Sequence, residues 1–167
     1  MPDTSSGKRF EEFTYERLII PEGWINLTPY ELKSVPTEKG QRYTHRKFPS
    51  QFNKYFGFKT ETILSKNIEP DFVFYHPKSN RVVALEVKSQ DSDGSVDEKL
   101  QTGGKKLWRL QKLFAKATNM PPENVSYSYL LKEKDFNKPE YADTFYDIHM
   151  DKCEYYFVND DFHFEIK

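Results

Sequence analysis

The sequence predicts an α/β (α+β) fold, in which a central mixed β-sheet is flanked by helices. Three observations predict it. Two apolar runs at 71–75 and 81–90 have the composition of a β-hairpin. A long amphipathic pattern over 96–118 indicates a helix, and further strand-like runs follow it. The chain has 167 residues, the size of one domain, so we expect a single domain over 1–167 with residues 1–7 flexible.

The N-terminal part predicts shorter elements. A mixed apolar stripe predicts a helix over 8–20, which ends before Pro21. Residues 26–47 give no long element, because three turn-forming residues interrupt them: Pro29, Pro36 and Gly40. The aromatic run at 56–64 favours a strand.

The hairpin is the strongest prediction. Val, Phe and Tyr favour strands, whereas the Pro, Ser and Asn between the two runs favour a turn. If the turn centres between Lys78 and Ser79, Asp71 lies opposite Glu86. Lys88 is two residues beyond Glu86 and therefore projects from the same face of the strand.

The C-terminal part alternates helix and strand. Ser95 and Glu98 form a capping box, which predicts that a helix begins at Val96. Gly103 and Gly104 are expected to kink or split this helix before it ends near Thr118. The following patterns predict a strand over 127–131, a helix over 139–150, and strands over 154–158 and 163–166.

The open end of the hairpin has the chemistry of a metal site. Residues directly opposed across two strands have Cβ atoms roughly 4.5–5.5 Å apart. Two carboxylates at that separation repel each other unless a cation lies between them. Asp71 and Glu86, with Lys88 beside them, are therefore able to form a Mg²⁺ site with a positioned water.

Pro70-Asp71, fourteen intervening residues and then Glu86-Val87-Lys88 resemble the motif of the PD-(D/E)xK nuclease superfamily, closest to type II restriction endonucleases. Pro2-Asp3 with Glu31-Leu32-Lys33, and the half-motif Asp97-Glu98-Lys99, satisfy looser versions of the pattern. Only the first match opens and closes a hairpin of core quality, and this context selects it.

The resemblance implies a restriction-endonuclease-like core and a catalytic set of Asp71, Glu86 and Lys88. It implies that Asp71, Glu86 and the backbone carbonyl of Val87 bind Mg²⁺, for which Mn²⁺ is expected to substitute. Lys88 is then expected to orient the attacking water or to stabilise charge on the phosphate.

Other residues extend this candidate site. Many members of the superfamily add an acid from the first helix, and Glu11 is the choice here, with Glu12 and Glu16 close behind. Gln90 continues the alternation of Glu86 and Lys88, so it either contacts the phosphate or caps the end of the strand. Gly94-Ser95, before the long helix, offers backbone N–H groups for a phosphate.

The net charge of −1 hides an uneven distribution. Residues 39–60 and 99–116 each hold six basic residues and no acid. Local potential of this kind matters more for phosphate binding than total charge. The spacing of Lys105, Arg109, Lys112 and Lys116 forms one helical stripe. The expected DNA contacts are Lys99, Lys105, Lys106, Arg109, Lys112, Arg46 and Lys47.

Other classes of site find little support. The four histidines lack zinc spacing, no glycine-rich phosphate loop is present, and no serine-nucleophile motif occurs. The single Cys153 excludes an intramolecular disulfide and suits a reducing compartment. Since no signal peptide or run of about 20 apolar residues is visible, we expect a cytoplasmic protein with no membrane partner.

The sequence therefore predicts a Mg²⁺-dependent DNA endonuclease that cuts both strands at specific sequences. One active site per chain predicts a homodimer or higher homo-oligomer matched to the symmetry of DNA. Alternatives are a structure-directed nuclease of the junction resolvase, homing or phage repair type, and a catalytically silent nucleic-acid-binding module. A protein-interaction domain is a further alternative, since the segment from 135 to the end is acidic.

Overall fold

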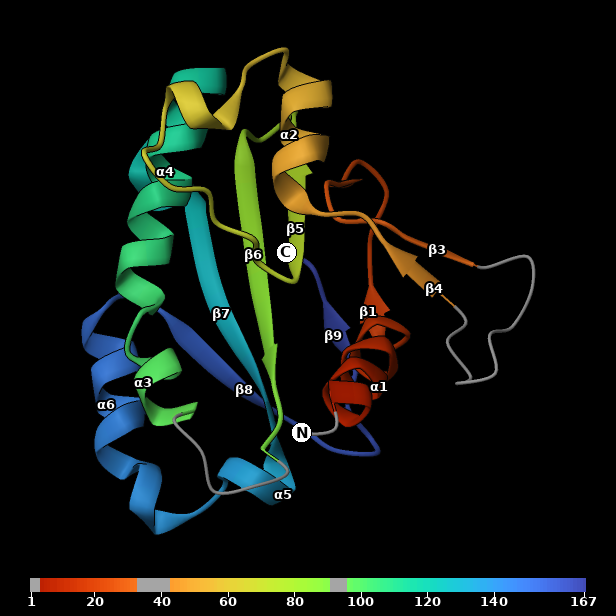
Figure 1. The fold of residues 1–167 in the computed structure, drawn as a ribbon, viewed down its shortest axis with the longest axis vertical. Coiled ribbons are helices and arrows are strands. Elements are labelled where there is room, and N and C mark those ends of the chain that lie inside the picture. The colour runs from red at the N-terminus through yellow and green to blue at the C-terminus, as the bar shows by residue number, and fades with distance from the viewer. Residues whose placement is uncertain (1–3, 33–42, 91–95) are drawn as a thin grey trace.

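A mixed five-stranded sheet forms the centre of the computed structural model, which describes residues 4–32, 43–90 and 96–167 (Figure 1). The strand order within these residues is β2-β5-β6-β7-β8. The strands are β2 Ile25–Asn26, β5 Phe72–His76, β6 Arg81–Lys88, β7 Val125–Lys132 and β8 Glu154–Val158. Antiparallel pairing joins β2, β5 and β6, whereas β6, β7 and β8 are parallel. The predicted α/β (α+β) class with a central mixed sheet is confirmed.

Helices cover both faces of this sheet (Figure 1). On one face lie α2, α4 and α6, which bury Phe52, Phe114 and Ile148 among others. On the other face α1 packs with its apolar side chains Phe10 and Phe13. The helices are α1 Thr4–Tyr15, α2 Phe48–Phe56, α3 Val96–Leu100, α4 Gly103–Thr118, α5 Glu133–Phe136 and α6 Ala142–Met150.

The predicted hairpin and its register are confirmed. Phe72 pairs with Leu85 and His76 with Arg81, and this register places Asp71 opposite Glu86. The turn ends at Asn80, which has a φ of 50°. Asn is several-fold enriched among non-glycine residues with positive φ values, so the Asn at this position favours the turn.

The long helix is split at its glycines, as predicted. Val96–Leu100 forms α3 and Gly103–Thr118 forms α4. A Cβ atom at Gly103 would lie 2.9 Å from the Tyr129 hydroxyl, so glycine permits the close approach of α4 to the sheet. The predicted capping residue Ser95 and the predicted phosphate-binding Gly94-Ser95 lie outside the described residues.

The N-terminal predictions need two corrections. Helix α1 begins at Thr4, inside the segment for which the sequence predicts flexibility, and it ends at Tyr15 rather than near residue 20. The residues before Pro21 instead form β1, Leu18–Ile19, because they pair in parallel with β9, Phe164–Glu165. Only residues 1–3 of the predicted flexible segment lie outside the described ranges.

The predicted strand at 56–64 is also wrong. Phe56 ends α2, Gly57 caps this helix with a φ of 73°, and a short 3-10 helix follows at Thr60–Thr62. Phe48, Phe52 and Phe56 recur every four residues and pack on one side of α2, and this helical period was the missed signal. The region 26–47, for which no long element is predicted, contributes the short pair β3 Tyr30–Leu32 and β4 Tyr43–His45.

The C-terminal predictions agree with the structure. The strand predicted at 127–131 lies within β7, and the strand predicted at 154–158 is β8. The region 139–150 forms a 3-10 helix, Pro139–Tyr141, that continues into α6. In the described part of the chain, no helix has the length and apolar character needed to cross a bilayer.

Candidate active site

The open end of the β5–β6 hairpin gathers charged side chains on one face of the sheet. Along β6 the side chains that face α4 are Val82, Ala84, Glu86 and Lys88, so this face changes from apolar to charged. Asp71 directly precedes β5, and its Oδ2 accepts a hydrogen bond of 2.8 Å from the backbone N–H of Val87. This bond fixes the Asp71 carboxylate across the hairpin from Glu86.

Two ammonium groups bind the Glu86 carboxylate. Lys88 Nζ lies 2.6 Å from Oε1, and Lys106 Nζ lies 2.8 Å from Oε1 and 2.7 Å from Oε2. The Tyr127 hydroxyl donates a further hydrogen bond to Oε2. Burial raises the pKa of Glu86, but the charges of Lys88 and Lys106 outweigh burial and hold this pKa below its ordinary value. Glu86 is therefore an ionised carboxylate although only 7% of its surface is exposed.

Asp71 has the opposite electrostatic environment. Burial, followed by the negative charge of Glu11, raises the pKa of Asp71 to about 7. The Lys88 ammonium and the hydrogen bond from Val87 oppose this change, and Glu86 adds to it. Burial is the larger cause of this raised pKa and the charge of Glu11 is the second, and a bound cation would lower the pKa of Asp71 again.

Lys88 forms an ion pair with Glu86 on its own strand and lies within the electrostatic influence of Asp71. Burial lowers its pKa, but the negative charges of Glu86 and Asp71 outweigh burial, so the pKa of Lys88 lies above its ordinary value. Lys88 is thus a firmly protonated cation between the two predicted metal ligands.

Glu11 reaches the same end of the hairpin from α1. Its Oε1 accepts a hydrogen bond from the Tyr30 hydroxyl and lies 3.1 Å from Nδ1 of His45. The rings of Tyr30 and His45 stack with centroids 4.3 Å apart. Of the helix acids that the sequence offered, Glu11 is the one whose charge acts most strongly on Asp71. Glu16 instead accepts a hydrogen bond from Tyr43, 3.0 Å away.

The sequence pattern does not predict His45 or Tyr127 as site residues, and it predicts Lys106 as a DNA contact rather than as a partner of Glu86. His45 pairs with Tyr30 across β3 and β4. The sequence pattern predicts neither of these two strands. Tyr127 and Lys106 come from β7 and α4, and each contacts Glu86 only because these elements pack beside β6. For Lys106 a signal was present, because it shares the core-facing stripe of Leu110 and Leu113.

The donor chemistry of this cluster fits Mg²⁺, which prefers carboxylate oxygens. Glu11, Asp71 and Glu86 supply three carboxylates around one hairpin end. Among the residues that the structure describes, however, no group of three or more His, Cys, Asp and Glu side chains is arranged to hold a metal ion. Both oxygens of Glu86 are taken by lysine ammonium groups, so metal binding requires an exchange of ion partners at Glu86.

Gln90 acts at the end of the strand. Its backbone N–H donates to Asp135 Oδ2 over 2.7 Å, and its Oε1 accepts a hydrogen bond of 2.6 Å from the Tyr141 hydroxyl. These contacts tie the residues after β6 to the segment around α5. They correspond to the capping alternative for Gln90 rather than to a phosphate contact.

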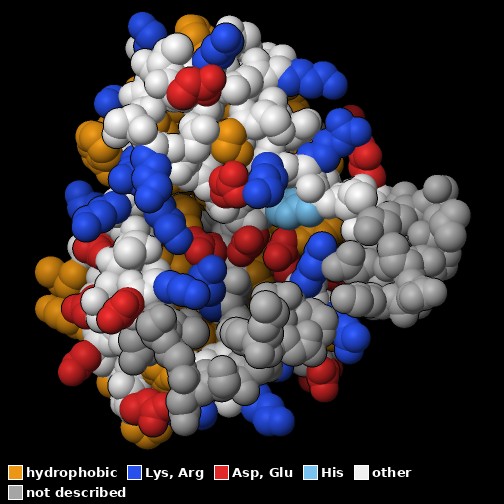
Figure 2. Space-filling view, in the orientation of Figure 1, with side chains coloured by type: hydrophobic (Ala, Val, Ile, Leu, Met, Phe, Trp, Pro, Cys, Tyr) orange, Lys and Arg blue, Asp and Glu red, His pale blue; other side chains and the backbone are white. Residues whose placement is uncertain are grey.

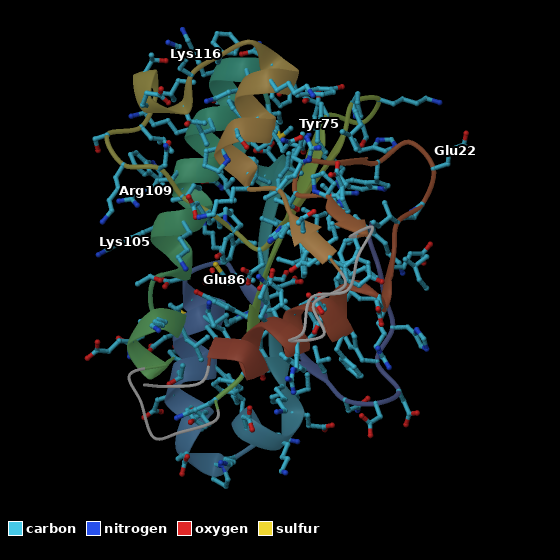
Figure 3. The ribbon with its side chains drawn as sticks, turned by 45° about the vertical axis from the view of Figure 1, so that its right-hand side comes forward. Glu22, Tyr75, Glu86, Lys105, Arg109 and Lys116 are labelled. Atoms are coloured by element: carbon cyan, nitrogen blue, oxygen red, sulfur yellow. The ribbon has the colours of Figure 1, made fainter. Side chains whose placement is uncertain are left out.

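The acids lie in a hollow bordered by cations. In Figure 2 acidic side chains gather at the centre of the face, with Lys and Arg side chains around them. Figure 3 shows Glu86 in the interior between α4 and α1, whereas Lys105 and Arg109 point outward from α4. Lys99, Lys105 and Lys112 are exposed, and Arg109 is half-buried.

The remaining predicted DNA contacts have acidic partners. Lys106 turns inward to Glu86. Arg46 pairs with Glu31 at 2.8 Å, and Lys47 pairs with Glu69 at 3.0 Å. Both of these pairs are at the surface, where they contribute little to stability and exchange readily.

Part of the chain matches the model of a known protein family. The PD-(D/E)XK nuclease superfamily domain matches residues 25–102, a little under half of the chain. The matched segment begins at β2, ends just after α3 and includes Asp71, Glu86 and Lys88. No curated protein and no solved structure matches the chain.

The fold and this match point to a nuclease as the class of protein.

Proposed function

We propose that the protein is a metal-dependent deoxyribonuclease that hydrolyses phosphodiester bonds. The observation that carries this proposal is the placement of Asp71 opposite Glu86, with Lys88 bound to Glu86, inside the segment that matches a nuclease domain. Buried carboxylates with opposite pKa shifts beside a lysine are typical of catalytic sites.

In this proposal Asp71, Glu86 and the backbone carbonyl of Val87 hold a Mg²⁺ or Mn²⁺ ion, and Glu11 adds a fourth oxygen donor. A divalent ion at such a site stabilises charge on the phosphate and acidifies a bound water. Lys88 lies next to both acids, so its ammonium orients the attacking water or stabilises charge on the phosphate. The N–H of Val87 keeps the Asp71 carboxylate in place.

The substrate in this proposal is duplex DNA. The basic stripe of Lys105, Arg109 and Lys112 lies on α4, whose first turn also reaches Glu86 through Lys106. Phosphates bound along this stripe therefore lie close to the acidic hollow. We propose sequence-specific double-strand cleavage of the restriction type, in a cytoplasmic homodimer that brings two such hollows to one duplex.

Incubation of the purified protein with supercoiled plasmid tests the proposal. We expect linear products in Mg²⁺ or Mn²⁺, no cleavage in EDTA, and cut ends that map to a recurring sequence. Cleavage of a synthetic four-way junction but not of the plasmid would favour a resolvase-type enzyme. DNA binding that is equal with and without metal, with no cleavage of either substrate, would identify a silent binding module and refute the proposal.

A further inference from the structure

Lys106 approaches Glu86 from outside the hairpin. It lies in the first turn of α4, and its ammonium contacts both oxygens of Glu86 at 2.7–2.8 Å. About a quarter of its side chain is exposed (28%), whereas the Glu86 side chain is 10% exposed. The ammonium therefore closes the solvent side of a buried carboxylate.

Lys106 and Lys88 differ in what they contact. Lys88 is two residues from Glu86 on the same strand, and its charge is coupled to Asp71 and Glu11 as well. Lys106 has an ion pair with Glu86 alone among the described residues. Lys88 is therefore part of the hairpin site, whereas Lys106 is a second cation supplied by a separate element.

Charge balance shows what a divalent ion would do to this pair. Glu11, Asp71 and Glu86 together carry three negative charges when ionised, and Lys88 and Lys106 carry two positive charges. A divalent ion beside Lys88 alone neutralises the three acids. Keeping Lys106 on Glu86 as well would leave an excess positive charge in a partly buried site, which is unfavourable.

We propose that Lys106 is an exchangeable counter-ion of Glu86, which occupies this carboxylate until a divalent metal replaces it and then contacts a phosphate of the nucleic acid. This inference rests on the proposed function. Along α4, Lys106 is one residue from exposed Lys105 and three residues from Arg109, so a released ammonium joins these cations on the same helix. Lys106 then adds a cation for phosphate binding to the basic stripe of α4, at the end of the helix nearest Glu86.

Tyr127 is a third partner of the Glu86 carboxylate. Its ring is 1% exposed, and its hydroxyl donates to Oε2 of Glu86 from the neighbouring strand. Because this bond does not involve a lysine, it holds the carboxylate in one orientation while its cationic partner changes. Tyr127 is in this sense a positioning residue for Glu86.

Calorimetric titration with Mn²⁺ tests the exchange without measuring cleavage. Lys106→Met removes the competing cation, so we expect Mn²⁺ to bind roughly tenfold more tightly than to the wild type. Lys105→Met removes the same charge from the adjacent exposed position and is expected to leave the affinity for Mn²⁺ unchanged within about twofold. Lys106→Arg keeps the competitor and is expected to stay near the wild type. Unchanged or weaker binding of Mn²⁺ by Lys106→Met would overturn the proposal.

The release of Lys106 can also be followed in the wild-type protein, which avoids any folding defect of the variants. Acetylation by a water-soluble ester, read by mass spectrometry, is expected to rise at Lys106 several-fold when Mg²⁺ is added, while Lys105 reacts equally in Mg²⁺ and EDTA. A constant reactivity of Lys106 would contradict the exchange.

Turnover separates this inference from the proposed function. At saturating Mn²⁺ we expect Lys106→Met to cleave DNA about tenfold more slowly although it binds the metal more tightly. A residue with only a structural role would weaken both metal binding and thermal stability. If the wild type cleaves DNA but Lys106→Met gains no affinity for Mn²⁺, only the role of Lys106 fails. If the wild type neither binds Mn²⁺ nor cleaves, both proposals fail.

Discussion

The two halves of strand β6 differ sharply on the face that meets α4. In the half near the turn, Val82 and Ala84 are almost fully buried in the apolar core. In the other half, Glu86 and Lys88 occupy the equivalent positions and are also largely buried, although both are charged. The same strand thus contributes apolar packing at one end and closely spaced charges at the other.

This difference indicates which half of β6 contributes to stability and which half contributes to function. Apolar burial stabilises a fold by about 25 cal/mol for each Å² removed from water. Buried charges gain little in comparison, because the cost of desolvation offsets their mutual attraction. The charged half is therefore expected to carry function, and the apolar half is expected to carry stability, with little overlap between the two.

The largest effect is expected from removing the charged half. Asp71→Ala, Glu86→Ala and Lys88→Ala should each slow DNA cleavage about a thousandfold or more, because each removes a ligand of the metal or a group that acts on the water. Single-turnover cleavage rates measure this effect. Glu22→Ala, which removes an exposed acid far from the site (Figure 3), serves as the control. A variant of the site that still cuts at the wild-type rate would remove its residue from the mechanism.

The next effect should come from the apolar half. Phe114 on α4 is fully buried and packs on the rings of Phe52 and Tyr75. Phe114→Ala is expected to lower the free energy of unfolding by about 3–4 kcal/mol, because it leaves a cavity in the core. Urea denaturation measures this change. The folded variant should still bind Mn²⁺ with the wild-type affinity, and a large loss of that affinity would show that the two halves are coupled.

A smaller effect should appear in the dependence of stability on pH. The pKa of Asp71 is raised from 3.8 to about 7, so the folded protein binds a proton more tightly than the unfolded chain. The stabilisation that comes from protonation of Asp71 is therefore complete below pH 4 and is lost as the pH rises through about 7. In EDTA, Asp71→Asn is expected to be more stable than the wild type at pH 8 by about 2 kcal/mol.

Thermal denaturation of both proteins at pH 5.5 and pH 8 measures this difference. Added Mg²⁺ should raise the melting temperature of the wild type at pH 8 and should have little effect on Asp71→Asn. An Asp71→Asn variant that is less stable than the wild type at pH 8 would show that burial and the neighbouring acids do not destabilise the ionised Asp71 carboxylate.

The smallest effect is expected at the surface of α4. Replacing Lys105, Arg109 or Lys112 singly by Ser should weaken DNA binding by roughly 1 kcal/mol and lower the slope of log K against log salt by about 1. Fluorescence anisotropy over a range of salt concentrations measures both quantities. Lys167→Ser, at an exposed lysine near Arg81 and Phe164, is the control. An unchanged slope would make the stripe a solvated surface without contact to DNA.

The hairpin could be predicted from the sequence because its information is local. A turn-forming run between two continuous apolar runs fixes the register, and the register alone places Asp71 opposite Glu86. The start of α3 and the split before α4 could also be predicted from the sequence, because capping residues and glycines affect the backbone of their immediate neighbours.

The remaining features depend on contacts between distant segments. The pair of Lys106 with Glu86 requires α4 to pack on β6, and the pair of His45 with Glu11 requires β4 to pack beside α1. The preference of single residues for helix or strand does not predict α2. Its aromatic residues favour strands, but they form a helix because their spacing places them on one buried face. The sequence thus predicts the two central strands of the site and the helix acid Glu11, but it does not predict the contacts of His45, Tyr127 and Lys106.

The central claim is that the open end of the hairpin binds a divalent metal through Asp71 and Glu86. Anomalous diffraction from a crystal soaked in Mn²⁺ tests it most directly. We predict one strong anomalous peak in direct contact with a carboxylate oxygen of Asp71 and one of Glu86, with the Lys106 ammonium displaced. A map with no peak at this position, in which both lysines still contact Glu86, would contradict the account.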